Sequence, residues 1–163
     1  MLASDQYPDA FHLQEAHRRI ANVVVYGTVE EIDDGKYEAR VQVGKLRTGW
    51  LPIATQRCGE DRQFWLPTQG EQVVVVSMCG NLDQGVIIGS FSRGRFPVPE
   101  TKGKNLAIYR DGTRIEYDTR SHTLNIVAGD GGINIKAPRG INIIGNITVQ
   151  GTVTATCVIS GCG

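Results

Sequence analysis

Few side chains in this chain have the types and spacing that catalysis needs. The three histidines are His12, His17 and His122, and the first two lie five residues apart, whereas two ligands on one helix face lie three or four apart. Two acidic pairs, Glu30–Glu31 and Asp33–Asp34, have the composition of a general acid and base. They flank an expected hairpin turn, however, where solvated charges are common. Because no nucleophile has a neighbouring base and no phosphate-binding loop or dinucleotide fingerprint is present, we expect no enzyme activity and no cofactor.

Three aromatic side chains are candidates for binding a ligand by stacking. Trp50, Phe64 and Trp65 are of the kind that hold single-stranded nucleic acid or sugars on the face of a small barrel. They lie beside Pro52 and Pro67 without interleaved basic residues, and the whole chain carries 17 Lys and Arg against 17 Asp and Glu. Nucleic-acid binding depends on local positive charge, so we expect no nucleic-acid partner and favour a role in the core or in contact with a partner protein.

The N-terminal region is predicted to be helical. Ser4–Asn22 is the only plausible helix, with Phe11, Leu13, Ala16 and Ile20 at loose helical spacing, and we expect residues 1–22 to form an arm or a partner-binding helix. No run approaches the roughly 18 apolar residues of a membrane-spanning helix, and the N-terminus is polar where a signal peptide is apolar. We therefore expect the chain to be made and kept soluble in a cytoplasm.

Short strands separated by turn signals follow from Val23 onwards. The run Val73–Val76 is apolar throughout, which suits a strand covered on both faces, by a core and by a neighbouring chain. Five or so strands of this length fit a small closed barrel of the oligonucleotide/oligosaccharide-binding (OB) type. The expected segments are Val23–Val29 and Tyr37–Val43, joined through the turn Asp33–Gly35, then Gly49–Ile53, the turn-rich Phe64–Pro67, Val73–Val76 and Gly85–Gly89.

A proline-rich segment separates this barrel from a second region. Pro97–Pro99 lacks two backbone donors, so it is excluded from a central strand and is expected to be an extended linker. Beyond it we expect a meander of three strands with turns at 111–112 and 118–121. The strands are Leu106–Arg110, Thr113–Tyr117 and Thr123–Val127.

The last third of the chain consists of β-prone runs punctuated by glycine. Gly132-Ile133-Asn134-Ile135 returns eight residues later as Gly140-Ile141-Asn142-Ile143, and Gly145–Val149 and Gly151–Ala155 follow. Alternate side chains of a strand point to the same side, so the Ile and Val residues gather on one face that a single chain cannot cover. The pattern predicts a shaft shared by several chains.

In this order and spacing, several segments resemble the central spike proteins of contractile phage tails and related injection machines, the baseplate assembly protein V family. The resemblance extends from about Val23 to Thr156. It implies a homotrimer whose N-terminal barrel binds the baseplate hub and whose C-terminal three-chain β-helix is driven through the outer membrane of the target bacterium. The most specific segments are Phe64–Pro67, Gly70–Val75, Gly85–Ser90, Phe96–Pro99 and Asp111–Thr113 with Ile115–Asp118.

The cysteines and the C-terminus depart from that family. Its members often end in a His-x-His pair whose three copies bind one iron ion, and this chain has no such pair, so we predict no metal site. The resemblance then implies either a tip closed in another way or, as we favour, a blunt end against a separate conical tip protein. Cys157 and Cys162 would lie near the threefold axis, where they could bind a soft metal or contact that tip protein. We favour small buried hydrophobes, and with Cys58 and Cys79 they form no Cys-x-x-Cys pair, so reduced thiols are expected.

The prediction is therefore an all-β protein: a five-stranded OB-fold-like barrel followed by an intertwined trimeric β-helix shaft. The expected parts are an arm (1–22), a hub-binding collar barrel (23–96), a linker (97–105) and the shaft (106–163). The expected function is that of a structural, membrane-piercing central spike in the tail baseplate of a virion. The alternative is an OB binding module for oligosaccharide or single-stranded nucleic acid on a trimeric stalk. Some related spikes carry a muramidase, and we expect none because barrel and shaft use nearly all of the 163 residues. The expected trimer core comprises Ile133, Ile135, Ile141, Ile143, Ile147, Val149 and Val153.

Overall fold

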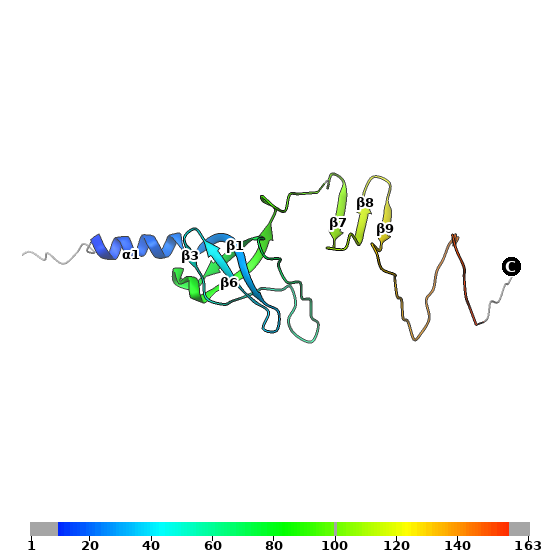
Figure 1. The fold of residues 1–163 in the computed structure, drawn as a ribbon, viewed down its shortest axis with the longest axis horizontal. Coiled ribbons are helices and arrows are strands. Elements are labelled where there is room, and N and C mark those ends of the chain that lie inside the picture. The colour runs from blue at the N-terminus through cyan, green and yellow to red at the C-terminus, as the bar shows by residue number, and fades with distance from the viewer. Residues whose placement is uncertain (1–9, 100, 157–163) are drawn as a thin grey trace, which may run out of the picture. The chain divides into compact units, whose positions relative to one another are not determined.

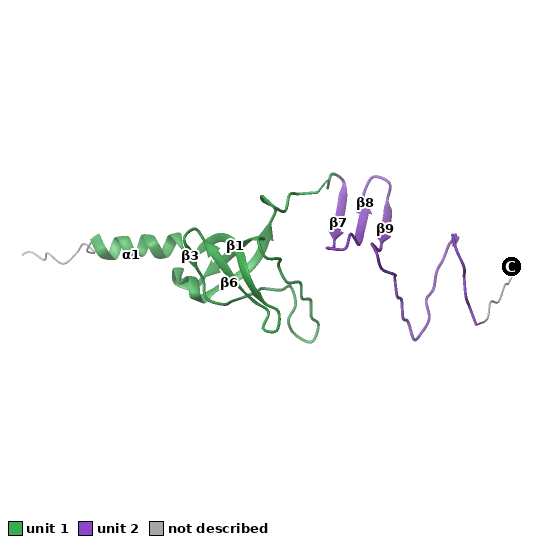
Figure 2. Cartoon of the chain, viewed as in Figure 1, with its two compact units in different colours: residues 1–102 green, residues 103–163 purple. Residues whose placement is uncertain are grey.

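The computed structural model describes residues 10–99 and 101–156, and the chain divides into two units, residues 1–102 and 103–163 (Figure 2). The first unit holds a helix and a six-stranded sheet, and the second holds a three-stranded sheet (Figure 1). The described part of the chain is thus mostly β with a single α-helix, as predicted. No helix among the described residues is long and apolar enough to cross a membrane.

Helix α1 spans Ala10–Ala21 and lies inside the predicted segment Ser4–Asn22, whose first residues fall outside the described residues. None of the residues of α1 is buried. The Glu15 carboxylate accepts hydrogen bonds from Arg18 at 2.7 and 2.8 Å and from Arg19 at 2.6 Å, and these bonds lower the pKa of Glu15 to about 2. The second half of the helix is therefore supported by its own side chains.

The end of α1 is fixed to the barrel by close backbone packing. Its last turn lies against the 3-10 turn η1, Met78–Gly80. Gly80 has φ +70, and a Cβ atom there would overlap the backbone of Arg19, so this approach is open only to glycine. Strand β1 begins at Val24, three residues after α1 ends at Ala21, so α1 is attached to the barrel at the start of β1.

The strands of the first unit close into a small barrel. Their order is β3-β2-β1-β5-β6, and β4 pairs with β2 on one side while Ile53, next to β4, bridges in parallel to Ile87 of β6. The N–H of Ala54 donates to the carbonyl of Ile87 at 2.7 Å and completes this closure. The two-residue β3 was not predicted. The elements are β1 (Val24–Asp33), β2 (Glu38–Val43), β3 (Leu46–Arg47), β4 (Leu51–Pro52), β5 (Gln72–Ser77), the 3-10 turn η2 (Leu82–Gln84) and β6 (Gly85–Phe91).

The core lies inside this barrel and follows the two-residue period of the strands. In β5 the buried positions alternate with half-buried ones, so Val73 and Val75 point inward while Val74 and Val76 point outward. The sequence predicted that both faces of this strand are covered. This chain covers the inner face, and a neighbouring chain over the outer face stays a prediction. The buried apolar residues are Val29, Ala39, Val41, Leu51, Val73, Val75 and Ile87.

The predicted hairpin of β1 and β2 is present, with a turn that differs in detail from the expected one. The connection is four residues long, and its left-handed residue is Tyr37, with φ +59, instead of the glycine of the Asp-Gly pair. The N–H of Lys36 donates to the Asp33 carboxylate at 3.1 Å. The Tyr37 ring packs edge-on against Phe64 with centroids 4.8 Å apart, and this contact supports the unusual backbone angle.

In the second unit, the predicted meander is present. Strand β7 (Lys104–Ile108) pairs with β8 (Arg114–Asp118), which pairs with β9 (Thr123–Val127), all antiparallel. The 111–112 turn is held by Asp111, whose carboxylate accepts the N–H of Thr113 at 3.0 Å and its hydroxyl at 2.8 Å. Strand β7 starts two residues before its predicted start, because the pairing with β8 extends to Lys104.

Residues 128–156 are all described and contain no β-strand. They run as extended segments that bend at Gly140, Gly145 and Gly151, with φ of 95, 136 and 148°. Figure 1 shows these segments as the brown-to-red trace after β9. The glycine punctuation of the sequence therefore corresponds to bends, and the hydrogen-bonding groups between the bends lie open to partners.

Substituting Gly27 tests the tight pairing of β1 with β2. A Cβ atom at Gly27 would overlap the carbonyl oxygen of Gln42 and lie 2.6 Å from Val41 Cγ1, so neither strand has room for it. Overpacking of this kind costs about 1–3 kcal/mol. We expect Gly27→Ala to lower the unfolding temperature of the barrel clearly in a thermal melt followed by circular dichroism. Gly59→Ala, whose Cβ would have no atom within 4 Å, is the control and should melt like the parent; equal melts for both would contradict this account.

Candidate functional site

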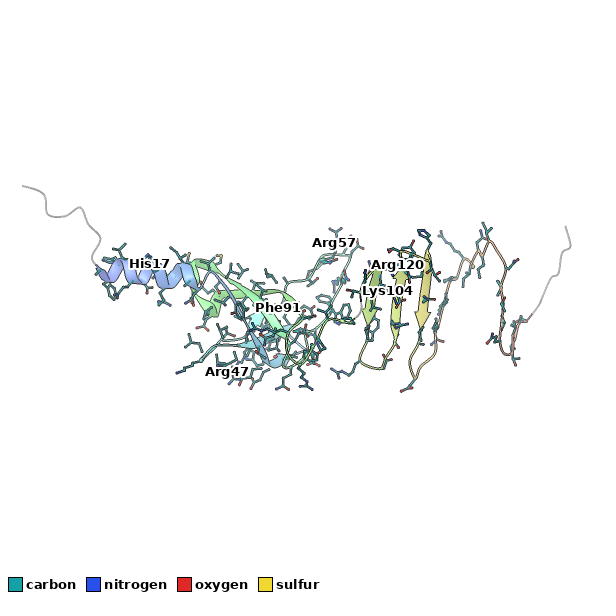
Figure 3. The ribbon with its side chains drawn as sticks, turned by 90° about the horizontal axis from the view of Figure 1, so that it is seen from above. His17, Arg47, Arg57, Phe91, Lys104 and Arg120 are labelled. Carbon is teal, nitrogen blue, oxygen red and sulfur yellow. The ribbon has the colours of Figure 1, made fainter. Side chains whose placement is uncertain are left out.

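The structure does not gather the candidate catalytic residues. His12 and His17 are exposed on α1, where Figure 3 shows the His17 side chain, and His122 is exposed in a turn with φ +54. Among the described residues, no group of three or more His, Cys, Asp or Glu side chains is placed to hold a metal ion. Cys58 and Cys79 carry exposed free thiols. The predicted tip residues, Cys157 and Cys162, lie outside the described residues.

The acidic pairs serve the barrel surface. The Glu30 and Glu31 carboxylates lie 2.8 and 2.6 Å from guanidinium nitrogens of Arg47 on β3, and so tie that short strand to β1. Arg40 lies 3.5 Å from Glu31 and stacks over the Trp50 ring at 4.6 Å. Glu30 and Glu31 are therefore ion-pair partners on the surface of the barrel, and Asp33 lies 3.8 Å from Lys36 Nζ in the turn.

The three aromatic candidates lie in different surroundings. Trp50 is half-buried, and the Arg40 guanidinium occupies one face of its ring. Phe64 and Trp65 are exposed on the long loop between β4 and β5, with 51% and 62% of their surface accessible. Tyr37 fixes this loop, because its hydroxyl oxygen accepts a hydrogen bond from the backbone N–H of Trp65 at 2.8 Å. Two of the three aromatic rings are thus exposed, and the third is partly covered.

The predicted trimer-core residues form an uncovered apolar surface in the part of the chain that the structure describes. We call these seven residues the shaft stripe. Each is exposed by 52–73%, and the last five lie in residues 140–156, which carry no charged side chain. Figure 3 draws the side chains that follow β9 as sticks along the extended trace. Ile144, which the sequence reasoning missed, is 92% exposed. It directly follows Ile143, and neighbouring residues of an extended segment point to opposite sides. The shaft stripe consists of Ile133, Ile135, Ile141, Ile143, Ile147, Val149 and Val153.

The meander adds a second uncovered surface of the same kind. The register of β7, β8 and β9 places one set of apolar residues on one face of the sheet, without a charged member. Ile115 and Tyr117 are each 41% exposed there, and Leu124 is 60% exposed. Sequence reasoning identified the strands but did not assign this face, although the period-two pattern of β8 carries the signal. The face comprises Ala107, Ile115, Tyr117, Leu124 and Ile126.

The opposite face of the meander holds its charges in pairs. Glu116 is 4% exposed, and its carboxylate lies 3.2 Å from Lys104 Nζ and 3.6 Å from Arg114 Nε. The Asp118 carboxylate accepts the N–H groups of Arg120 and Ser121, which lower its pKa. Ion pairs and backbone hydrogen bonds thus hold the charged groups of this face, which also carries the exposed apolar residues Ile108 and Val127.

Comparison with known proteins agrees with this architecture. Residues 25–91 match the model of the type VI secretion system/phage-baseplate injector OB domain. The chain is also similar to the spike protein of Escherichia phage P2, with 32% identity over 146 residues, which cover 89% of this chain and 63% of that protein.

The matches to the injector OB domain and to a phage spike protein support the baseplate spike family for this chain. The family resemblance found in the sequence is thereby confirmed, and so is an OB-like barrel at its N-terminal side. The family model ends at Phe91, so the shaft stripe and the meander lie beyond the matched domain. The chain spans 63% of the length of the phage P2 relative.

Removing one hydroxyl tests how the aromatic loop is held. Tyr37→Phe deletes the acceptor of the Trp65 N–H but keeps the ring that packs on Phe64. Loss of one such bond costs about 0.5–1.5 kcal/mol. In a Trp50→Phe background, we expect stronger acrylamide quenching of Trp65 fluorescence. Tyr26→Phe, on a strand of the barrel, should leave the quenching unchanged; identical quenching in both variants would show that the loop is held in another way.

Proposed function

We propose that this chain is the structural, non-enzymatic central spike of a contractile tail baseplate. In this proposal it acts as a homotrimer, with residues 23–96 as the collar on the baseplate hub and residues 106–163 as the shaft. When the sheath contracts, the shaft is driven through the outer membrane of the target bacterium. The virion is the site of action, and assembly takes place in the host cytoplasm.

The shaft stripe is the observation that carries the proposal. Its seven Ile and Val residues remain more than half exposed in one chain. Full burial of each such side chain against two further copies would contribute about 1.5–3 kcal/mol. Winding three chains around one axis also pairs the open backbone groups between the glycine bends and removes sheet edges. A threefold assembly thus provides the missing cover for both side chains and backbone.

The family relationship supports the mechanical role. The phage P2 relative is described as a spike protein, and the matched domain as an injector OB domain. The chain also has a composition suited to crossing lipid, because residues 140–156 carry no charge. A charged side chain inside a bilayer costs several kcal/mol, so its absence lowers the barrier to insertion.

The topology of the collar gives the spike a direction. Val24, next to α1, pairs with Val76, which pairs with Val86, at one end of the strands. The other end holds Gln72 paired with Phe91, the last residue of β6 before the linker. Helix α1 and the linker to the shaft therefore leave from opposite ends of these strands. This arrangement supports a collar that presents α1 to the hub while the shaft leaves on the other side.

The second candidate function is an OB module that binds single-stranded nucleic acid or oligosaccharide. It is favoured by the exposure of Phe64 and Trp65. Against it stand the covered ring face of Trp50 and the balanced charge of the chain. We expect no shift of single-stranded DNA in a gel at low salt, where electrostatic binding is strongest. A salt-sensitive shift that is lost in Trp65→Ala would favour the binding module over the spike.

The oligomeric state is the direct test of the proposal. We expect a particle of 3 × 17.8 = 53.4 kDa by light scattering during gel filtration. The double variant Ile141→Asp and Ile143→Asp places two carboxylates per chain in the shaft core and should yield smaller species, because buried unpaired charges are strongly unfavourable. Asn142→Asp, which adds a charge on the outward side, is the matched control and should remain trimeric. A parent chain that runs as a stable 17.8 kDa monomer would refute the spike.

The same variants test the mechanical role in whole particles. We expect particles built with the Ile141→Asp and Ile143→Asp chain to lose most of their infective or bactericidal titre, with less release of a periplasmic marker from target cells. Particles with Asn142→Asp should retain both activities. Undiminished titre and release from the double variant would separate the shaft from membrane penetration.

A further inference from the structure

The barrel carries an apolar face on its outside that no described element of the chain covers. Cross-strand partners lie on the same side of a sheet, so the outward residues of β1, β5 and β6 form rows. Val24 and Tyr26 are exposed by 60% and 61%, and Ile88 by 54%. We call this surface the outer barrel face. It comprises Val24, Tyr26, Val74, Val76, Val86, Ile88 and Phe91.

This face is ordered and uncharged. The Tyr26 and Phe91 rings, on β1 and β6, pack edge to face with centroids 6.0 Å apart. The guanidinium of Arg93 lies 6.0 Å from the centre of the Tyr26 ring, at the rim. None of the seven members is an acid or a base. In a strand with one face in water, polar residues alternate with apolar ones, whereas β5 has valine at every position from 73 to 76. The outer barrel face therefore has the composition of an interface.

The size of the face decides between two kinds of occupant. A side chain of this type buries roughly 100 Å² of apolar surface when fully covered. At the observed exposures the seven side chains offer on the order of 300 Å², well below the roughly 800 Å² that each partner contributes to a stable complex. A separate protein docking here alone would thus bind weakly. A second copy of the chain, held nearby by a common shaft, would dock at millimolar effective concentration and needs no larger area.

We infer that the outer barrel face packs against its equivalents in the other copies of the chain, and so lines the threefold axis of the collar. This inference rests on the proposed trimer and adds to it the surface by which the collars meet. The continuous valine run of β5 then has a role on both of its sides: Val73 and Val75 fill the barrel core, and Val74 and Val76 fill the interface between chains.

Disulfide trapping in the full-length chain tests the inference. The four native cysteines are replaced by serine, and Tyr26→Cys or Ile88→Cys is introduced singly. Leu46→Cys is the matched control, because Leu46 is 60% exposed on β3, at the other end of the strand order. After mild oxidation, we expect at least fivefold more covalent dimer on a denaturing gel for Tyr26→Cys or Ile88→Cys than for Leu46→Cys. Adding Tyr26→Glu to Ile88→Cys should abolish that dimer.

Mass measurement of the same samples distinguishes failure of the proposed trimer from failure of the axial placement of the outer barrel face. A trimer without covalent dimer at either position would overturn the axial placement of the face and leave the proposed spike intact. Equal dimer at all three positions, which random collisions produce, would also overturn it. A monomer by light scattering would remove both the proposed function and this inference.

Discussion

The structure depends on one constraint: each sheet of this chain has two faces, and a single chain of this length covers only one of them. In the barrel, β1, β2, β4, β5 and β6 enclose a small core of seven apolar residues. Their outer side keeps Tyr26 and Ile88 open to water. In the second unit the imbalance is larger, because the meander and the segments after it have no inner layer. Exposed apolar area on this scale is typical of an interaction site.

The distribution of charge follows the same division. Ion pairs lie on the sides that one chain completes alone, such as Glu116 with Lys104 and Arg114 on the meander, and Glu30 and Glu31 with Arg47 on the barrel. The apolar faces lack such pairs. Pairing charges within the chain keeps the uncovered faces free of groups that would be costly to bury on assembly. Ion-paired surfaces and exposed apolar surfaces are thus largely separate in this chain.

Sequence patterns predicted most of the strands because both of their signals, alternation and turn residues, are local. The 111–112 turn and the β8 pattern were sufficient for the meander, and the glycines after 132 marked real bends. The details that were missed depend on contacts across the fold. Tyr37 is left-handed where it packs on Phe64 and accepts the backbone N–H of Trp65, and β3 pairs with β2 while Arg47 reaches two carboxylates of β1. The outward faces of the barrel and meander likewise require strand register, which a list of segments does not supply.

The attachment of α1 and of the linker at opposite ends of neighbouring strands has a mechanical consequence. A force that enters beside Val24 and leaves after Phe91 runs along the strands and at right angles to their hydrogen bonds. Load in this direction is shared by all the bonds between β1, β5 and β6 at once, whereas a force across the sheet would open them one after another. The barrel strands that join α1 to the linker are thus loaded in shear, and their weakest direction lies across the sheet.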